Sequence, residues 1–472
     1  MGGLVLLWTS TSAPGAVYVA ILLLVLGNAG QRLSESFLEH QLKDHLGTIC
    51  IRICSFVPSL VVYMMTVYIA FEKDGTYHGR FRFAAIFMLG TYVFFLVGSV
   101  WYSGEELCDE SNLRKIYRIC KAALGKGKSK YPTSPNCYYW KDYKQDHLYD
   151  DGKGLRLKPR VPRMFRWLDK AAIVEAEDPE EVSAVQEKNG KLCTVQEVRE
   201  VKSLVPMIYL GLTLFGYSFL LASGNTFFVA QANSAISVIT DIVGNDIFLL
   251  FLFKDVTKNM SRFIYFLTLE CLTKLRVMDS MSRRKEATII RVGFGMLGAV
   301  ICCFIAWKIE VRRLSKDTNT TVALVPQFIL LGMAEGLVDR GLQNLFYDHV
   351  AKSMWSFEDS FSELVIGTGK LLVIPFVLIF GDWFDEYVDS SHLDKYFWIL
   401  GTVNAAFLLV YAYYSFKYAH KEACPEDEKV SMELDLFPQL DLQDPSEEDN
   451  NMEAQQLEEG NKGYLLSMSN VF

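Results

Sequence analysis

Charged residues are scarce in this chain, and the spacings that mark several kinds of functional site are missing. Only 22% of its 472 residues are charged, whereas 51% are hydrophobic and 13% are aromatic. A soluble chain of this length normally has a more polar surface. The ten cysteines follow no disulfide or zinc pattern. The sequence also lacks a glycine-rich phosphate loop, a catalytic triad and a cluster of metal ligands. We therefore expect no metal, no cofactor and no enzymatic activity.

The apolar residues gather into blocks that are long enough to cross a membrane. About 20 helical residues span the ~30 Å of hydrocarbon in a bilayer. Inside hydrocarbon every backbone polar group must be paired within the segment, so each block is predicted to be a helix. The sequence therefore predicts an all-α membrane protein with nine or ten spans. A short apolar segment, 1–12, precedes nine blocks at about 16–31, 48–70, 83–101, 204–230, 233–253, 288–308, 323–346, 361–380 and 396–417.

A polar segment divides these blocks into two groups. Between Arg114 and Lys170 it carries sixteen Lys or Arg against five Asp or Glu, and such an excess near a span marks the cytoplasmic side. It has no aromatic interleaving of the kind that binds nucleic acid. Because successive spans cross the membrane in alternating directions, Asn319 is then expected on the outer side of the membrane. It begins an Asn-Thr-Thr glycosylation pattern. We predict a helical bundle over 1–101, a basic cytoplasmic loop over 102–203, a second bundle over 204–421 and an acidic disordered tail over 422–472.

Two bundles joined by a long cytoplasmic loop are typical of a secondary transporter, whose solute site lies between the halves at the middle of the membrane. Channels and receptors can have the same number of spans. The sequence contains no pore-filter motif and no ligand-binding domain, so a channel or receptor is the weaker interpretation.

Ionisable residues inside the apolar blocks are the first candidates for function, because each costs at least ~2.5 kcal/mol at the centre of a membrane helix. Glu335 and Asp339 are four residues apart and share one face of the block 323–346. Glu363 and Lys370 are seven apart and share a face of the block 361–380. These groups either line a wet cavity that binds solute and protons, or pair between neighbouring helices. Glu335 lies deepest and is followed by Gly336.

Other candidates lie in two further blocks. Phe227 and Phe228 lie near the end of the block 204–230 and Gln231 follows it; together, aromatic and amide groups could hold an organic solute. The alternative is ordinary packing between membrane helices. Arg32 ends the block 16–31 and could take part in proton coupling, or could reach the membrane interface as a snorkelling side chain.

Several stretches resemble the plant nitrate/peptide transporter family, which is related to the proton-dependent oligopeptide transporters of the major facilitator superfamily. The resemblance extends from about residue 155 to 420 and is looser over the first hundred residues. The stretches that carry it are FRWLDKAAI at Phe165–Ile173, CTVQEVREVK at Cys193–Lys202, IRVG at Ile290–Gly293, EVRRL at Glu310–Leu314, VPQF at Val325–Phe328 and HLD at His392–Asp394.

This resemblance implies a major facilitator fold in which the blocks correspond to helices three to twelve. The family's first two helices, and with them its proton-coupling Glu-x-x-Glu-Arg motif, are then expected to be absent. Glu335 matches the helix-ten glutamate that faces the amino group of the substrate in peptide-transporting relatives. Phe227, Phe228 and Gln231 lie where relatives line the helix-seven pocket. Either Gln31 or Arg32 matches a cationic position of helix four.

Asp339, Arg340 and Lys370 depart from the small or apolar residues that are usual in the family. Apart from these departures, the resemblance implies a proton-coupled symporter of nitrate, peptides or another small solute, in the plasma or vacuolar membrane. The alternative is a family member that no longer transports and has a structural or regulatory role, or an incomplete gene product. The expected partners are a small solute or ion, protons and the lipid bilayer, without nucleic acid.

Overall fold

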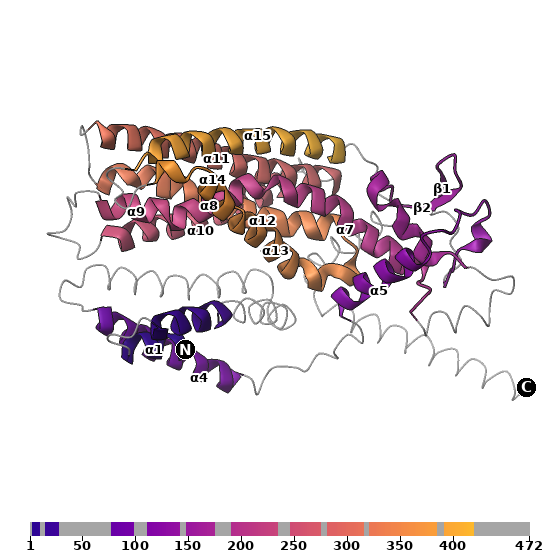
Figure 1. Cartoon of the computed structure of the whole chain (residues 1–472), viewed down its shortest axis with the longest axis horizontal. Helices are drawn as coiled ribbons and strands as arrows, with labels where there is room; N and C mark the ends of the chain where they lie inside the picture. The colour runs from indigo at the N-terminus through magenta and orange to yellow at the C-terminus, as the bar shows by residue number, and fades with distance from the viewer. Residues whose placement is uncertain are drawn as a thin grey trace, which may run out of the picture.

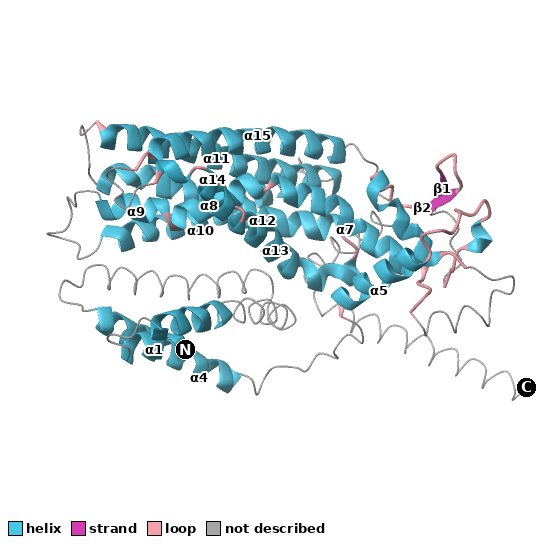
Figure 2. Ribbon diagram, in the orientation of Figure 1, coloured by secondary structure: helices cyan, strands magenta, loops and turns pink. Residues whose placement is uncertain are grey.

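In a computed structural model, the structure of the chain is described for residues 2–9, 15–27, 77–98, 111–141, 148–174, 190–234, 246–274, 281–315, 321–384 and 391–419. Arg32, Asn319 and the acidic segment 422–472 lie outside these residues, so the expectations for them stay predictions. Within the described part of the chain, helices dominate, and the single sheet is a two-stranded antiparallel hairpin of β1 (Leu148–Asp150) and β2 (Leu155–Leu157) (Figure 2). The fold is the expected all-α one.

Long helices from the second half of the chain form one bundle (Figure 1). Among the described residues, four helical segments are long and apolar enough to cross a membrane, or five if a bent pair is taken as one span. The four are Lys285–Leu314, Thr321–His349, Lys352–Ile379 and Leu393–Lys417. The elements of this bundle are α7 (Val195–Thr213), α8 (Phe215–Asn225), α9 (Phe227–Ser234), α10 (Asp246–Lys274), α11 (Met281–Leu314), η4 (Thr321–Leu324), α12 (Val325–His349), η5 (Lys352–Phe357), α13 (Glu358–Leu371), α14 (Val373–Ile379), η6 (Gly381–Trp383) and α15 (Leu393–Ala419).

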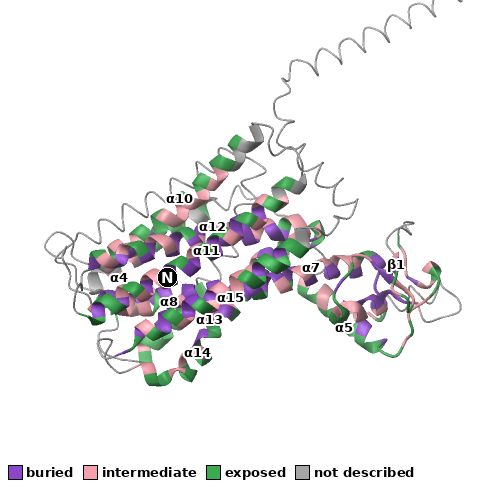
Figure 3. Cartoon of the chain, turned by 90° about the horizontal axis from the view of Figure 1, so that it is seen from above, coloured by how far each residue is buried: buried purple, intermediate pink, exposed green. Residues whose placement is uncertain are grey.

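The outward surface of the bundle is apolar. Large hydrophobic side chains such as Leu378, Ile379, Leu409 and Phe416 are exposed there, and Figure 3 shows buried residues between the helices with exposed ones on their outer sides. A soluble protein rarely exposes so much contiguous apolar surface. Lipid contact accounts for it, and the chain is an integral, multi-pass membrane protein.

Among the described residues before 100, the helices are α1 (Gly2–Thr9), the helix 15–27 and α4 (Tyr77–Gly98). Helices α1 and α4 pack against each other. The apolar side chains of the helix 15–27 and of α4, including Leu22 and Val97, are largely exposed, as expected of segments that face lipid or other membrane helices.

The bent span consists of α7, α8 and α9. The segments Val195–Thr213 and Phe215–Ser234 meet at an angle of 49°. At the break, the Leu214 amide donates to the Gly211 carbonyl oxygen at 2.9 Å, a short-range bond in place of the regular helical pattern. Gly211 also allows close packing, because a Cβ there would lie 2.8 Å from a methyl carbon of Val365 on α13. The bend directs α8 into the centre of the bundle.

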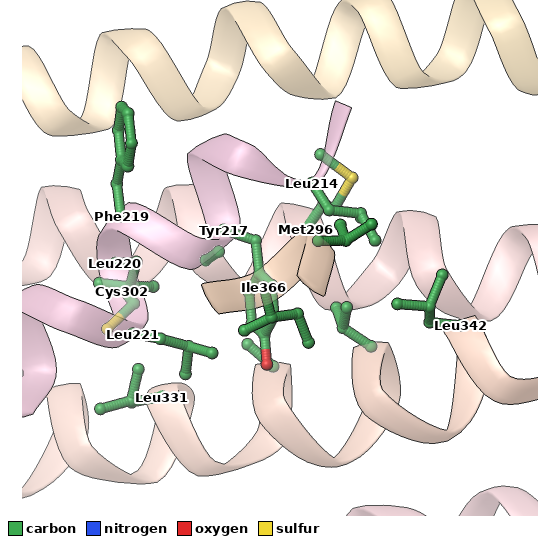
Figure 4. Packing of buried hydrophobic residues seen from close by; sticks show 14 of the residues in the cluster. Leu214, Tyr217, Phe219, Leu220, Leu221, Met296, Cys302, Leu331, Leu342 and Ile366 are labelled. Atoms are coloured by element: carbon green, nitrogen blue, oxygen red, sulfur yellow. The ribbon is translucent and has the colours of Figure 1, made fainter. Parts of the chain in front are cut away.

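The centre of the bundle is closely packed by apolar side chains from α8, α11, α12 and α13 (Figure 4). Tyr217 of α8 is fully buried, and its hydroxyl oxygen points toward the helix that carries Leu331 and Leu342. Cys302 is buried in the same core, where its thiol donates to the Gln327 carbonyl oxygen at 3.2 Å. Van der Waals packing of this kind holds membrane helices together, since lipid is as apolar as the core itself.

Helices α10 and α12 approach each other through two glycines on one face of α12. A Cβ at Gly332 would collide with the Lys254 carbonyl oxygen, and one at Gly336 would collide with Ser261 and with the Lys258 carbonyl oxygen. Small residues four apart commonly bring membrane helices into backbone contact. This backbone contact sets the positions in which the charged side chains of α10 and α12 meet.

The described residues between 111 and 203 form a small folded unit at one end of the bundle. It contains α5 (Asn112–Gly125), η2 (Pro135–Cys137), the β1–β2 hairpin, η3 (Arg163–Ala172) and the first turns of α7. Its own apolar core includes Ile119, Leu157 and Val198. It contacts the bundle where Asn112 Nδ2 donates to Ser356 Oγ at 2.7 Å. The predicted cytoplasmic position of this unit stays a prediction.

Two sequence stretches that carry the family resemblance meet inside this unit. Asp169 of the FRWLDKAAI stretch and Lys202 of the CTVQEVREVK stretch form an ion pair of 2.7 Å, and neither side chain is exposed. Lys202 also donates to the Leu157 carbonyl oxygen. Burial raises the pKa of the Asp169 carboxyl above its ordinary value, while Lys202 acts in the opposite direction. At the start of α7, Thr194 and Glu197 form a reciprocal capping box.

Candidate functional site

A ladder of five charged side chains connects α10 and α12. Lys254, Lys258 and Arg262 project from α10, and Glu335 and Asp339 project from α12. Lys254 Nζ lies 3.1 Å from Glu335 Oε2, and Lys258 Nζ pairs with Glu335 Oε1. Lys258 Nζ also lies 3.3 Å from Asp339 Oδ2, as does a terminal nitrogen of Arg262. We call these five residues the ion ladder.

The ladder follows from matching periodicities. The three cations recur at every fourth residue of α10, and the two carboxylates are four residues apart on α12, so each set occupies one helical face. The glycine contact holds the two backbones close enough for the side chains to pair along the helices. Each carboxylate lies between two successive cations and contacts both. Pairing of this kind is what makes ionised groups tolerable inside a membrane protein.

Buried groups on two other helices support the ladder. The Tyr217 hydroxyl of α8 donates to Asp339 Oδ1 at 3.1 Å. On α11, Arg291 donates to the Gly336 carbonyl oxygen at 3.0 Å, and its guanidinium carbon lies 4.1 Å from the centroid of the Tyr265 ring on α10. The ladder is thus fixed by side chains from all four of these helices.

Exposure of the ladder increases steadily from one end to the other. The exposed fraction of the side chain is 10% for Lys254, 15% for Glu335, 20% for Lys258, 27% for Asp339 and 29% for Arg262. The more exposed end points toward the C-termini of α10 and α12. The ladder is therefore most accessible at its Arg262 end.

The structure brings together Glu335 and Asp339, two of the predicted site residues, in this ladder. Lys370 and Glu363 lie on α13, where Lys370 is half-buried and Glu363 is exposed. Their roles as substrate-binding or proton-coupling groups stay predictions. Arg340, whose position on α12 follows Asp339, donates to Gln343 Oε1 at 2.8 Å.

The aromatic and amide candidates of α9 make contacts inside the bundle. Phe228 is fully buried between Phe328 and Phe397, with ring centroids 5.8 and 5.6 Å away. Phe227 stacks on Phe384 at 5.2 Å and also packs against Tyr396. These contacts agree with the packing interpretation, and a role of the aromatic pair in solute binding stays a prediction.

Gln231 belongs to a second buried polar cluster. Its amide donates to Glu310 Oε2 at 2.5 Å and accepts from Gln327 at 3.2 Å. Glu310 in turn forms an ion pair of 2.6 Å with Arg313. This cluster ties α9 to α11 and α12.

Sequence reasoning missed the three cations of the ladder. The apolar block at 233–253 ends where they begin, so the sequence places residues after 253 in a connection between spans. The structure places them inside α10, a single helix that extends from Asp246 to Lys274. The available signal was the spacing of Lys254, Lys258 and Arg262, which matches that of Glu335 and Asp339. In the part of the chain that the structure describes, no three His, Cys, Asp or Glu side chains come together as a metal site.

Comparison with known proteins gives this architecture a family. The model of the POT family matches residues 17–379 of the chain. The chain belongs to the POT family. The expected resemblance to the plant nitrate/peptide transporters is confirmed: the chain is 26% identical over 440 residues to protein NRT1/PTR family 5.6 of Arabidopsis thaliana, covering 87% of this chain and 72% of that protein. It is 26% identical over 446 residues to protein NRT1/PTR family 5.5 of the same plant, covering 89% and 81%.

Two solved POT family structures have the same fold. An auto-inhibited POT family peptide transporter aligns with a TM-score of 0.57 and 12% identity, over 90% of this chain and 81% of that one. The POT family transporter PepTSo aligns with a TM-score of 0.57 and 13% identity, over 89% and 82%. At such identities the likeness establishes the major facilitator fold, and it leaves the solute to be argued from the residues of this chain.

Proposed function

We propose that this chain is a proton-coupled carrier of a small anionic solute such as nitrate, and that the solute binds at the exposed end of the ion ladder. Membership of the POT family supports the general role in transport. The observation that carries the choice of solute is the pairing of Glu335 with both Lys254 and Lys258. A carboxylate that is shared between two ammonium groups is not available to a third cation, such as the amino group of a peptide.

The charge of the ladder also favours an anion. It has three cations and two carboxylates, which leaves an excess of one positive charge. The neighbouring charges Arg291 and Asp255 act on the same groups with opposite signs, so they leave this excess unchanged. Arg262 at the exposed end carries a planar, delocalised cation of the kind that binds carboxylates and other planar oxyanions through paired hydrogen bonds.

The remaining site candidates have supporting roles in this proposal. Asp339 holds Lys258 and Arg262 in position, and Phe227, Phe228 and Gln231 fix the bent helix against α11, α12 and α15. Lys370 and Glu363 on α13, and Arg32 near the first apolar block, would act on the solute or the protons from outside the ladder. The plasma membrane and the vacuolar membrane are both suitable locations.

The test is uptake into oocytes that express the full chain, with an acidic medium outside. Isotopically labelled nitrate and a labelled dipeptide are offered separately, and surface expression is measured in parallel. We expect acid-stimulated uptake of nitrate that exceeds uptake of the dipeptide. Preferential uptake of the dipeptide would overturn the choice of solute. No uptake of either, from protein present at the surface, would instead favour a family member that does not transport.

A further inference from the structure

A second carboxylate in the bundle is more deeply buried than any group of the ion ladder. Glu358 is the first residue of α13, and only 1% of its surface is exposed. It belongs to neither the ladder nor the Gln231 cluster, and no sequence pattern singled it out. An ionised carboxylate in such a place is costly unless it is paired.

The hydrogen-bond partners of Glu358 are mainly neutral donors. Ser362 Oγ donates to Oε1 at 2.8 Å, while the Gln343 amide and the Tyr347 hydroxyl each lie 3.4 Å from Oε2. Among the described residues, no cation forms a direct ion pair with Glu358. The guanidinium of Arg340 reaches it only through Gln343, to which it donates at 2.8 Å.

A second acidic group is in contact with Glu358. The adjacent residue Asp359 carries a carboxylate whose negative charge disfavours a second negative charge on Glu358. Two carboxyl groups that share a site commonly bind a proton more readily than either would alone.

The surroundings of Glu358 leave both of its charge states accessible. The N-terminus of α13 and the Arg340 guanidinium favour the charged form, whereas burial and the Asp359 carboxylate favour the neutral form. On α7, the contact with α13 closest in sequence to Glu358 is neutral, through Gly211 against Phe361 and Val365. Asp359 on its own helix and Arg340 on α12 are charged groups that act on Glu358.

A route for protons to this site is also present. Tyr347, whose hydroxyl donates to Glu358, lies near the end of α12, and 42% of its surface is exposed. Its phenol links the buried carboxyl to the surface, next to the folded unit that contains α5. Proton exchange with bulk water therefore needs no rearrangement of the apolar core.

We propose that Glu358 is a proton-binding site of this carrier, taking up one proton on a carboxylate oxygen and releasing it through Tyr347. The proposal rests on the proposed proton coupling for its role in transport. The binding of the proton itself needs no transport and can be measured separately. The site deepens the function by naming the residue that carries the proton in this bundle.

The direct test is infrared difference spectroscopy of the purified full-length protein during pH jumps. A protonated carboxylic acid has a carbonyl band that a carboxylate lacks. We expect a band that appears on acidification and disappears in Glu358→Gln. The band should also shift when the protein is produced with carbon-13-labelled glutamate. Asp382→Asn, which changes an exposed carboxylate of η6, is the control and should keep the band.

Two outcomes would overturn the proton site: no glutamate band over the whole accessible pH range, or a band unchanged by Glu358→Gln. If Glu358→Gln does not fold, Glu358→Asp keeps a carboxyl group, and the band should then respond to heavy-carbon aspartate instead. A band that behaves as expected in a protein without nitrate uptake would support the proton site while refuting the proposed function. If the proton site and the proposed function are both correct, Glu358→Gln should retain nitrate uptake that no longer responds to external pH.

Discussion

Lys258 of α10 and Glu335 of α12 form an ion pair at the centre of a ladder that extends along two helices. Lys258 also contacts Asp339, and Glu335 also contacts Lys254, so each group of the pair has a second partner of opposite charge. Charge is balanced pair by pair up to Arg262, at the exposed end. Changes to single members of the ladder therefore have different consequences at its two ends.

At the buried end, replacing Glu335 with Gln should destabilise the protein. Lys254 and Lys258 then lose a charged partner, and a hydrogen bond to a charged group contributes about 1.5–3 kcal/mol. We expect a lower midpoint in thermal unfolding and a large loss of nitrate uptake, because the two lysines no longer hold their positions. Asp382→Asn is the matched control of an exposed carboxylate. Unchanged stability and uptake in Glu335→Gln would show that the ladder has no role.

At the exposed end, Arg262→Gln should affect the solute more than the fold. Arg262 is the most exposed cation of the ladder, and we propose that it contacts the anion directly. Loss of one charge-assisted hydrogen bond should raise the KM for nitrate roughly tenfold or more. Concentration-dependent uptake measures this effect, with Arg312→Gln, an exposed arginine of α11, as the control. A KM equal to that of the control would place the solute elsewhere.

The contact between α10 and α12 can be tested through its glycines. Gly336→Ala introduces a methyl group that collides with Ser261 and with the backbone at Lys258, so the helices must separate. Overpacking of this kind typically costs about 1–3 kcal/mol, and the ladder should weaken with it. Gly367→Ala in α13 is the control, because nothing lies within 4 Å of its new Cβ. Equal thermal stability of the two variants would contradict the close contact.

Because Asp169 and Lys202 form a buried ion pair, the effects of replacing each of them on the stability of the protein should not add. Asp169→Ala leaves the Lys202 ammonium buried without its charged partner, and breaking such a pair costs about 3–5 kcal/mol. Replacing both residues, as Asp169→Leu with Lys202→Met, should recover most of that loss, because no buried charge remains. Size-exclusion chromatography and thermal unfolding of the purified variants measure these changes in stability, with Lys191→Met as a surface control. A double variant less stable than Asp169→Ala would contradict this explanation.

The spans of the bundle could be predicted because hydrocarbon imposes length and polarity on each segment independently. The blocks 288–308, 323–346 and 396–417 each fall inside a helical segment that can cross a membrane, and the block 361–380 exceeds such a segment by one residue. No knowledge of neighbours is needed for that inference. The family resemblance came from short stretches such as those around Asp169 and Lys202, which the structure brings into contact.

The ladder could be predicted only in part, since its two halves lie far apart in the sequence. Glu335 stood out as an acidic residue in an apolar block. Lys258 did not, because its charged neighbours make the segment resemble a polar loop between spans. Only knowledge of the partner helix reveals that it is helical and paired. Glu358 precedes its apolar block and was hidden for the same reason. Phe228 faces the core because of a bend at Leu214 and a break at Thr226 that hydropathy does not reveal.

The glycine contact gives the ladder a mechanical property as well as a chemical one. With Gly332 and Gly336 against the backbone of α10, the two helices are in backbone contact, and the five charges join them along the same face. We therefore expect the two helices to move as a single strut during a change of conformation, with the spacing of the five charges kept. A solute released at the Arg262 end would therefore leave through movement of surrounding helices relative to this strut, while the strut itself stays intact.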